Sequence, residues 1–120
     1  MSYLQCCGAL HQRHADSGEL GAADASMLMR SRYSAYVLDR LDYLLATWHA
    51  STRPAHLGPN EPGLKWLGLE VKAHHVQDAD HATVEFVARS KFGGRAHRLH
   101  EISRFVREDS VWYYLAGEMR

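Results

Sequence analysis

The chain is poor in the features that would assign it to several large classes of protein. None of its 120 residues falls in an apolar run of the 18 or so residues needed for a membrane span. Its two cysteines, Cys6 and Cys7, are adjacent and do not make a secreted disulfide framework. Residues 1–5 lack the basic and apolar regions of a signal peptide. We therefore expect a cytoplasmic protein that has no membrane partner.

A net charge is also missing, because 14 Lys and Arg residues balance 14 Asp and Glu residues. Proteins that bind nucleic acids usually carry a basic excess or a basic face. A nucleic-acid accessory role is therefore the function class that the composition favours least. Hydrophobic residues make up 46% of the chain, which is enough for one core, and the length fits a single domain.

Proline is scarce, and its three occurrences all lie between residues 51 and 63. This clustering predicts a loop there. Before the loop, apolar side chains recur at helical spacing, which predicts a helix over 26–39 with Ser26 as its N-cap and a shorter helix over 43–49. Residues 1–25 contain small residues and no helical stripe, so we expect an irregular leader.

The second half of the chain alternates apolar and polar residues with a period of two, which is typical of half-buried strands. The alternation predicts strands over 66–77, 83–92, 97–107 and 111–116. Gly93-Gly94 is a strong signal for a tight hairpin turn. Short connections between strands favour an antiparallel meander. The chain is therefore expected to be an α+β domain, with N-terminal helices packed on a curved four-stranded antiparallel sheet.

Several short phrases occur in an order that resembles one protein family. They are Leu28-Met29-Arg30-Ser31-Arg32-Tyr33, Thr47-Trp48-His49, Trp66-Leu67-Gly68-Leu69 and His100-Glu101-Ile102-Ser103-Arg104-Phe105. On these residues, the region from Ala25 to Gly117 resembles the middle domain of the YchJ-like proteins. The resemblance implies the nuclear-transport-factor-2-like (cystatin-like) fold, a cone of helices closed by a curved sheet. We expect residues 26–120 to form this cone domain.

The resemblance also implies a SEC-C zinc motif at the N-terminus, in which two groups of cysteine or histidine ligands follow each other. Cys6 and Cys7 match the second group, and the first group would lie before Met1. Either the true start lies upstream or this member has lost the site. Since zinc takes four ligands, Cys6 and Cys7 are predicted to be the remnant of an incomplete site. We expect no cofactor, and zinc only if the upstream cysteine pair is restored.

Charged residues inside a mostly apolar cone need partners. Arg30 or Arg32 is expected to pair with Glu85 or Glu101, which would make either a structural ion pair between helix and sheet, the favoured reading, or an anion-binding group. The aromatic residues are expected to be mainly core, although tryptophans at the cone mouth would suit a flat or cationic ligand. The other members predicted for this pocket or ion-pair network are Tyr33, Trp48, Arg89, Arg104 and Trp112.

Two residues are candidates for catalysis, Glu101 and His49. Glu101 lies mid-strand, where a buried carboxylate can act as a general base, and a nearby arginine would stabilise developing negative charge. The wider fold uses a His–Asp dyad in its catalytic members. Possible dyads here are His49 with Asp42 and His100 with Glu101. Neither pair has a specific spacing, so a structural role is preferred for His49.

These observations favour a non-catalytic module that binds a small molecule or another protein. The alternative is a small isomerase or hydrolase that acts on a small molecule with a pocket carboxylate. A homodimer is a further expectation, since open sheets of this fold often pair face to face. The sequence does not identify the ligand or partner.

Overall fold

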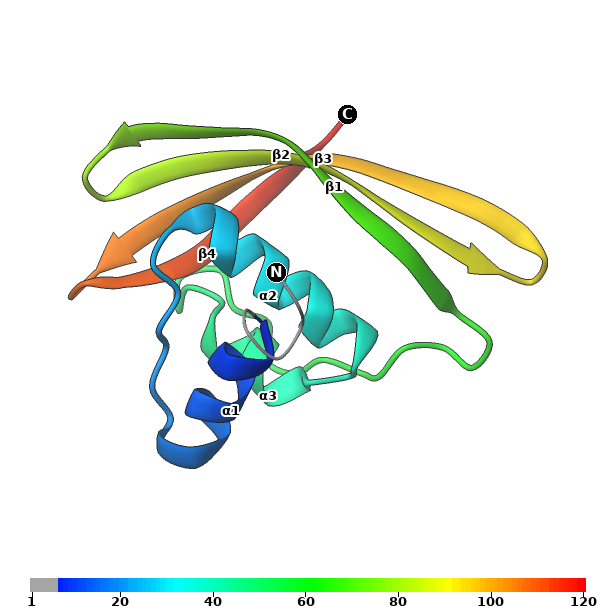
Figure 1. The fold of residues 1–120 in the computed structure, drawn as a ribbon, viewed down its shortest axis with the longest axis horizontal. Helices are drawn as coiled ribbons and strands as arrows, with labels where there is room; N and C mark the ends of the chain where they lie inside the picture. The colour runs from blue at the N-terminus through cyan, green and yellow to red at the C-terminus, as the bar shows by residue number, and fades with distance from the viewer. Residues whose placement is uncertain (1–6) are drawn as a thin grey trace.

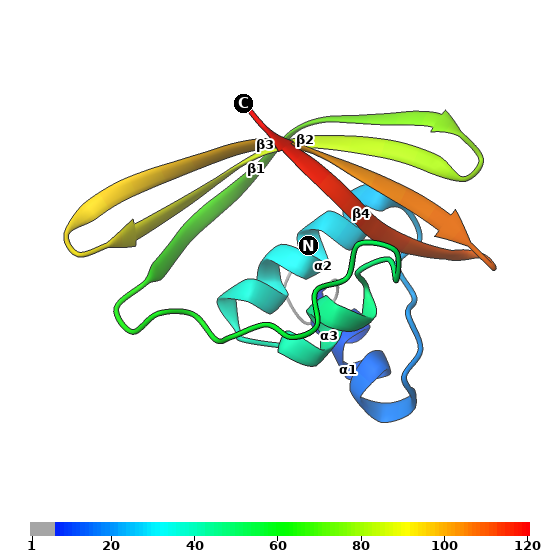
Figure 2. The same cartoon turned by 180° about the vertical axis from the view of Figure 1, so that it is seen from behind.

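The computed structural model describes residues 7–120, which form three helices followed by four strands. The helices are α1 (Cys7–Ser17), α2 (Ala25–Val37) and α3 (Leu41–Ala46); the strands are β1 (Lys65–Asp78), β2 (His81–Phe92), β3 (Arg95–Glu108) and β4 (Val111–Met119). The strands pair antiparallel in the order β1-β2-β3-β4. All three helices lie on one side of the strongly twisted sheet (Figures 1 and 2). The predicted α+β architecture is confirmed.

Helix α2 begins one residue before the predicted start. Its N-cap is Asp24, not Ser26, and the Asp24 carboxylate accepts a 2.8 Å hydrogen bond from the Met27 backbone N–H. Aspartate is among the strongest N-cap residues because it satisfies an N–H group that has no partner inside the helix. The cap fixes the point at which the chain enters the helix that lies under the sheet.

The prediction of an irregular leader was wrong for residues 7–17, which form α1. This helix has no continuous apolar stripe, but it packs against the other helices, and two of its side chains are buried. Leu10 is 7% exposed and His11 is 2% exposed. Most helices of this length depend on such packing for their stability, so the pattern within the segment alone did not reveal it.

The second predicted helix ends earlier than expected. Residues 47–49 run beside β4 instead, since the Tyr114 N–H donates to the Thr47 carbonyl at 2.8 Å and the His49 N–H donates to the Tyr114 carbonyl at 2.7 Å. These bonds tie the end of α3 to the sheet. They also turn Trp48 toward the Tyr114 ring, with the two ring centroids 5.1 Å apart.

The predicted hairpin at Gly93-Gly94 is confirmed, because both glycines have positive φ angles, 60° and 79°, between paired strands β2 and β3. Irregular register interrupts the β1–β2 pairing at three places and the β3–β4 pairing between Arg104 and Phe105. Such bulges bend a strand and increase its twist. They help the sheet to curve over α2 and give it an inner and an outer face.

The main core lies between α2 and the inner face. Alternate residues of β2 point inward from the strand, as the period of two requires. The buried members of this cluster are Ala25, Leu28, Met29, Ala82, Val84, Phe86, Ala88, Phe105 and Trp112. A second cluster joins the three helices through Leu10, Ala35, Tyr43 and Leu44. None of the helices between residues 7 and 120 is long and apolar enough to cross a membrane.

Candidate functional site

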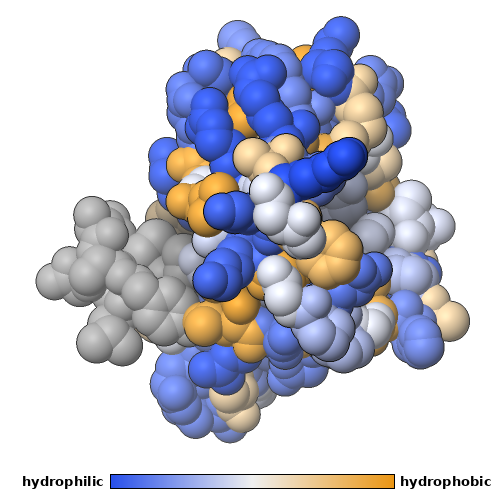
Figure 3. Space-filling model, turned by 90° about the vertical axis from the view of Figure 1, so that its right-hand side faces the viewer, coloured by the Kyte–Doolittle hydropathy of each residue, from blue (hydrophilic) through white to orange (hydrophobic). Residues whose placement is uncertain are grey.

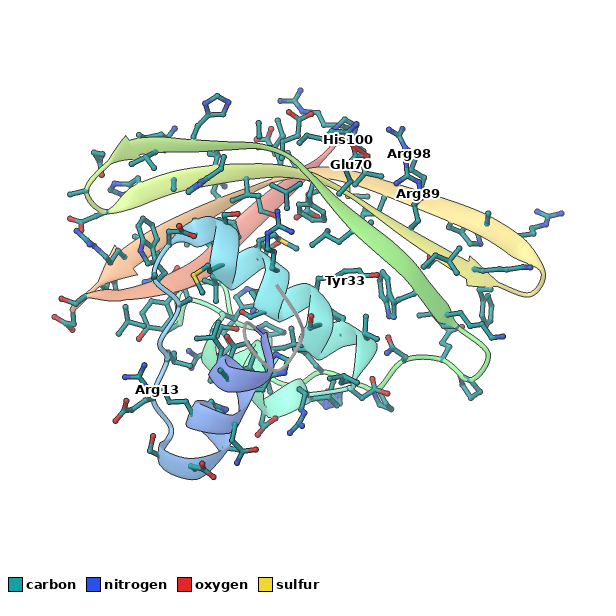
Figure 4. All side chains as sticks on the ribbon, in the orientation of Figure 1. Arg13, Tyr33, Glu70, Arg89, Arg98 and His100 are labelled. Carbon is teal, nitrogen blue, oxygen red and sulfur yellow. The ribbon has the colours of Figure 1, made fainter. Side chains whose placement is uncertain are left out.

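A cavity of about 360 Å³ opens between α2 and the inner face of the sheet. Its volume lies in the range of sites that hold small organic ligands, and such sites combine apolar walls with a few polar groups. The apolar and aromatic part of the wall consists of Met29, Tyr33, Tyr36, Trp66, Phe86, Ala88, Leu99 and Tyr114; the more polar groups are Arg32, Asn60, Glu101 and Ser103. Figure 4 shows Tyr33 reaching from α2 toward β1.

Arg32 is the most deeply buried charged group in this wall, with 2% of its surface exposed. Its Nη1 donates to the Leu44 carbonyl at 2.8 Å and to Thr47 Oγ1 at 2.7 Å. The guanidinium also lies over the rings of Tyr114 and Trp48, at 4.5 and 5.1 Å from their centroids. Burial lowers the pKa of Arg32, because desolvation disfavours the charged form.

The predicted ion pair between Arg32 and Glu85 or Glu101 is therefore not formed. Within residues 7–120, no carboxylate lies within 4.0 Å of the Arg32 guanidinium. The sequence left Arg30 and Arg32 as alternatives; Arg32 is the buried one, and its polar contacts are made to the end of α3. Cation–π contacts with two aromatic rings supply part of the compensation that a carboxylate would otherwise give.

Glu101 lines the same cavity from β3. The Ser103 hydroxyl donates a hydrogen bond to its carboxylate. A side chain at Gly117, on β4, would overlap this carboxylate, so the glycine gives it room. Burial, and next the negative charge of Glu101, raises the pKa of Tyr114 to about 12. The cavity thus contains a cation from the helix and a carboxylate from the sheet.

Two other members of the predicted network, Glu85 and Arg89, lie on the outer face and not in the cavity. Glu85 Oε2 accepts from His100 Nε2 at 2.6 Å. Arg89 Nη1 lies 3.8 Å from Glu70 Oε1, and Glu70, Arg89 and His100 are seen together on the far side of the sheet from the helices in Figure 4. The remaining arginines named above, Arg30 and Arg104, are exposed.

Neither predicted histidine dyad forms. His49 Nε2 lies 2.8 Å from Glu108 Oε2, and its Nδ1 lies 2.7 Å from Ser51 Oγ, so Asp42 is not its partner. His100 lies next to Glu101 in a strand, and successive side chains of a strand point to opposite faces. His100 therefore meets Glu85 outside, while Glu101 points inside.

The tryptophans are distributed differently from the prediction. Trp66, which was not among the predicted pocket residues, lines the cavity and makes an edge-to-face contact with Tyr33 at a centroid distance of 5.7 Å. Trp112 is 7% exposed and belongs to the core, and Trp48 packs against Arg32. On the face shown in Figure 3, hydrophobic residues form small separate patches among hydrophilic ones.

One cavity residue had no signal in the sequence. Asn60 comes from the proline-containing loop, where its side-chain N–H donates to the Tyr36 carbonyl at 2.5 Å and its side-chain oxygen accepts from Trp66 Nε1 at 3.4 Å. A loop has no periodicity that predicts which way a side chain points. Ser103 had one signal, its place two residues from Glu101 on the same face of a strand.

No group of three or more His, Cys, Asp or Glu side chains within the described part of the chain is arranged to hold a metal ion. The predicted zinc remnant at Cys6 and Cys7 lies outside the residues whose side chains the structure describes. Zinc binding there stays a prediction.

Comparison with known proteins places this chain in a family. The family described as YchJ, middle NTF2-like domain, matches residues 24–117. A UPF0225 protein of Methylibium petroleiphilum is 62% identical over 98% of this chain and 83% of its own, and one of Bordetella pertussis is 59% identical over 99% and 87%. The solution structure of a SEC-C motif containing protein from Rhodopseudomonas palustris has a TM-score of 0.81 and 32% identity, and covers 98% of this chain and 91% of that one. The chain therefore belongs to the YchJ-like family of UPF0225 proteins, which confirms the resemblance read from its motifs.

Proposed function

We propose that the domain binds a small organic molecule in the cavity between α2 and the sheet, as a ligand-binding module with no catalytic role. The observation that carries this proposal is the buried Arg32 in the cavity wall, whose charge no carboxylate of residues 7–120 neutralises by direct contact. Burying an ion costs several kcal/mol, roughly, even after the protein relaxes. A ligand group that accepts hydrogen bonds from Arg32 explains why a charge is kept there.

The absence of a histidine from the cavity supports a binding role over a catalytic one. No histidine of the described residues lines the cavity, and Nε2 of both His49 and His100 contacts a carboxylate elsewhere. The His–Asp arrangement that serves as a general base in catalytic members of the wider fold is therefore not built here.

One observation favours a second candidate function, an isomerase or hydrolase. Glu101 lines the cavity, and the Ser103 hydroxyl holds its carboxylate. A positioned carboxylate can remove a proton from a bound substrate, and Arg32 would stabilise the negative charge that develops. Conversion of a bound compound that is abolished in Glu101→Gln, with binding retained, would establish this function in place of the first.

The test is a thermal-shift screen of a small-molecule library against the wild-type chain and two arginine variants. A true ligand raises the melting temperature by mass action, and at a concentration 100 times Kd it adds about 2.7 kcal/mol of stability. We expect Arg32→Gln to lose the shift and Arg30→Gln, an exposed change on the same helix, to keep it.

A second variant covers the outcome in which Arg32→Gln fails to fold. Ala88→Leu places a larger apolar side chain in the cavity wall and should abolish the shift without removing a charge. The proposal is wrong if no compound shifts the wild-type chain, or if Ala88→Leu, as a folded protein, responds like the wild type.

A further inference from the structure

The cavity contains two opposite charges that do not touch each other. Arg32 reaches it from α2 and Glu101 from β3. Their charged atoms are more than 4.0 Å apart, because no ion pair joins them, whereas pairs on the outer face close to 2.6 Å. Two opposite charges in one apolar cavity would gain energy by direct contact, and here the protein keeps them separate.

Both charges have hydrogen-bonding capacity left for a ligand. Arg32 is anchored through Nη1 alone to Leu44 and Thr47, with a further contact to the side chain of Tyr36. A guanidinium has more donors than these contacts use, and its planar edge fits a carboxylate. Glu101 is held by the one hydroxyl of Ser103, and a carboxylate accepts several hydrogen bonds.

The rest of the cavity is suited to an apolar group. Phe86, Leu99 and Trp66 line it, and the Trp66 ring makes an edge-to-face contact with Tyr33. The volume of about 360 Å³ accommodates a single small molecule with a ring or a branched chain.

We infer that the ligand is a zwitterion of the α-amino-acid class, with its carboxylate on Arg32, its ammonium on Glu101 and an apolar side chain against Trp66, Phe86 and Leu99. This inference rests on the proposed binding function. A ligand with only a carboxylate would leave Glu101 with no counter-ion and bring two negative charges together. A ligand with only an ammonium would leave Arg32 with no counter-ion and bring two positive charges together. Misplaced charges of this kind oppose the wrong ligands and give specificity.

The experiment measures binding by calorimetry for phenylalanine, tyrosine, tryptophan, leucine and methionine. Each is compared with its analogue lacking the amino group and its analogue lacking the carboxyl group; for phenylalanine these are 3-phenylpropionate and phenethylamine. We expect at least one amino acid to bind, and both of its analogues to bind at least tenfold more weakly. The inference is wrong if no amino acid of the panel binds, or if an analogue binds as tightly as its parent.

Charge variants then test which protein side chain contacts the ammonium group of the ligand. Glu101→Gln should weaken the amino acid tenfold or more and leave the deaminated analogue unchanged or improved. Glu85→Gln, a matched change on the outer face, should alter neither. Equal affinity of Glu101→Gln and wild type for the amino acid would overturn the inference.

The experiments distinguish a failure of this inference from a failure of the proposed binding function. If the library screen finds a ligand whose effect depends on Arg32 and on the space at Ala88, but the amino acids do not bind, the cavity is a binding site and only its assignment to zwitterions is wrong. If neither a library compound nor an amino acid binds, the proposed binding function and the assignment to zwitterions are both wrong.

Discussion

The two faces of the sheet carry similar charged residues, which contact oppositely charged or polar partners on the outer face and form no ion pairs with any described residue in the cavity of the inner face. On the outer face, Glu85 and His100 are in contact at 2.6 Å, and Glu70 contacts Lys72 at 2.8 Å. On the inner face, the Glu101 carboxylate accepts a hydrogen bond from the Ser103 hydroxyl, and within residues 7–120 neither Glu101 nor Arg32 of α2 forms an ion pair. Outer charges neutralise one another beside water. Inner charges remain available to whatever enters the cavity.

The helices create this difference. The period of two sends neighbouring residues of β3, such as His100 and Glu101, to opposite faces. Since α1, α2 and α3 all lie on one side (Figure 2), only Glu101 is placed in a partly enclosed, low-dielectric space, where an unpaired charge costs more and a matched ligand gains more. Charged residues of the same types therefore form structural contacts on the outer face and are available to bind a ligand on the inner face.

The largest effect is expected from the core of the inner face. Phe105 is 1% exposed, and Phe105→Ala should lower the free energy of unfolding by about 3–5 kcal/mol, because it leaves a cavity in the core. Val106, the next residue, points to the outer face and is half-buried, so Val106→Ala should cost about 1 kcal/mol. Urea denaturation measures both. Equal losses would show that the two faces are equally covered.

An intermediate effect is expected from His11, through which α1 joins the helical layer. Its Nε2 lies 2.9 Å from the Ser31 carbonyl oxygen, and its ring meets Tyr43 edge-on at 4.7 Å. Burial lowers the pKa of His11 from its ordinary value of 6.5. Below about pH 6.5 the unfolded chain therefore binds a proton that the folded chain resists, so stability falls as the pH falls.

Denaturation curves between about pH 7 and pH 5.5 measure this dependence, since that window spans the titration of an unfolded histidine. His11→Gln should flatten the slope of stability against pH, and His75→Gln, an exposed change on β1, should leave it as in the wild type. If both variants keep the wild-type slope, His11 does not link α1 docking to pH.

Elements that depend on local interactions could be predicted from the sequence, and elements that depend on distant contacts could not. The strands and the Gly93-Gly94 turn depend on local alternation and on φ angles that glycine adopts freely, so they were predicted well. Helix α1 depends on contacts of Leu10 and His11 with other helices, which no local pattern encodes. Its existence was therefore missed.

The site was predicted less well than the fold for the same reason. Periodicity placed Glu101 on the same strand face as Leu99 and Ser103, but it left Arg30 and Arg32 as alternatives. It could not show that Arg32 bonds the end of α3 or that His49 meets Glu108, 59 residues away. Asn60 entered the cavity from a loop without any periodic signal. Partners between distant elements depend on the packing of the whole domain.

The smallest effect is expected from the outer ion pair. The Glu85 and His100 side chains are 33% and 25% exposed, and exposed pairs contribute about 0.2–1 kcal/mol. At about pH 5.5, below the ordinary pKa of histidine, Glu85→Gln should therefore lower the free energy of unfolding by about 0.5 kcal/mol in dilute buffer and by less at about 1 M salt, where the Debye length is about 3 Å. Glu101→Gln, made on the covered face, should show no such dependence on salt, because buried charges are screened much less. Denaturation of both variants at both salt concentrations makes the comparison. A salt-dependent loss in both would mean that water reaches Glu101 as freely as Glu85, and the distinction between a solvated outer face and an enclosed inner site would no longer hold.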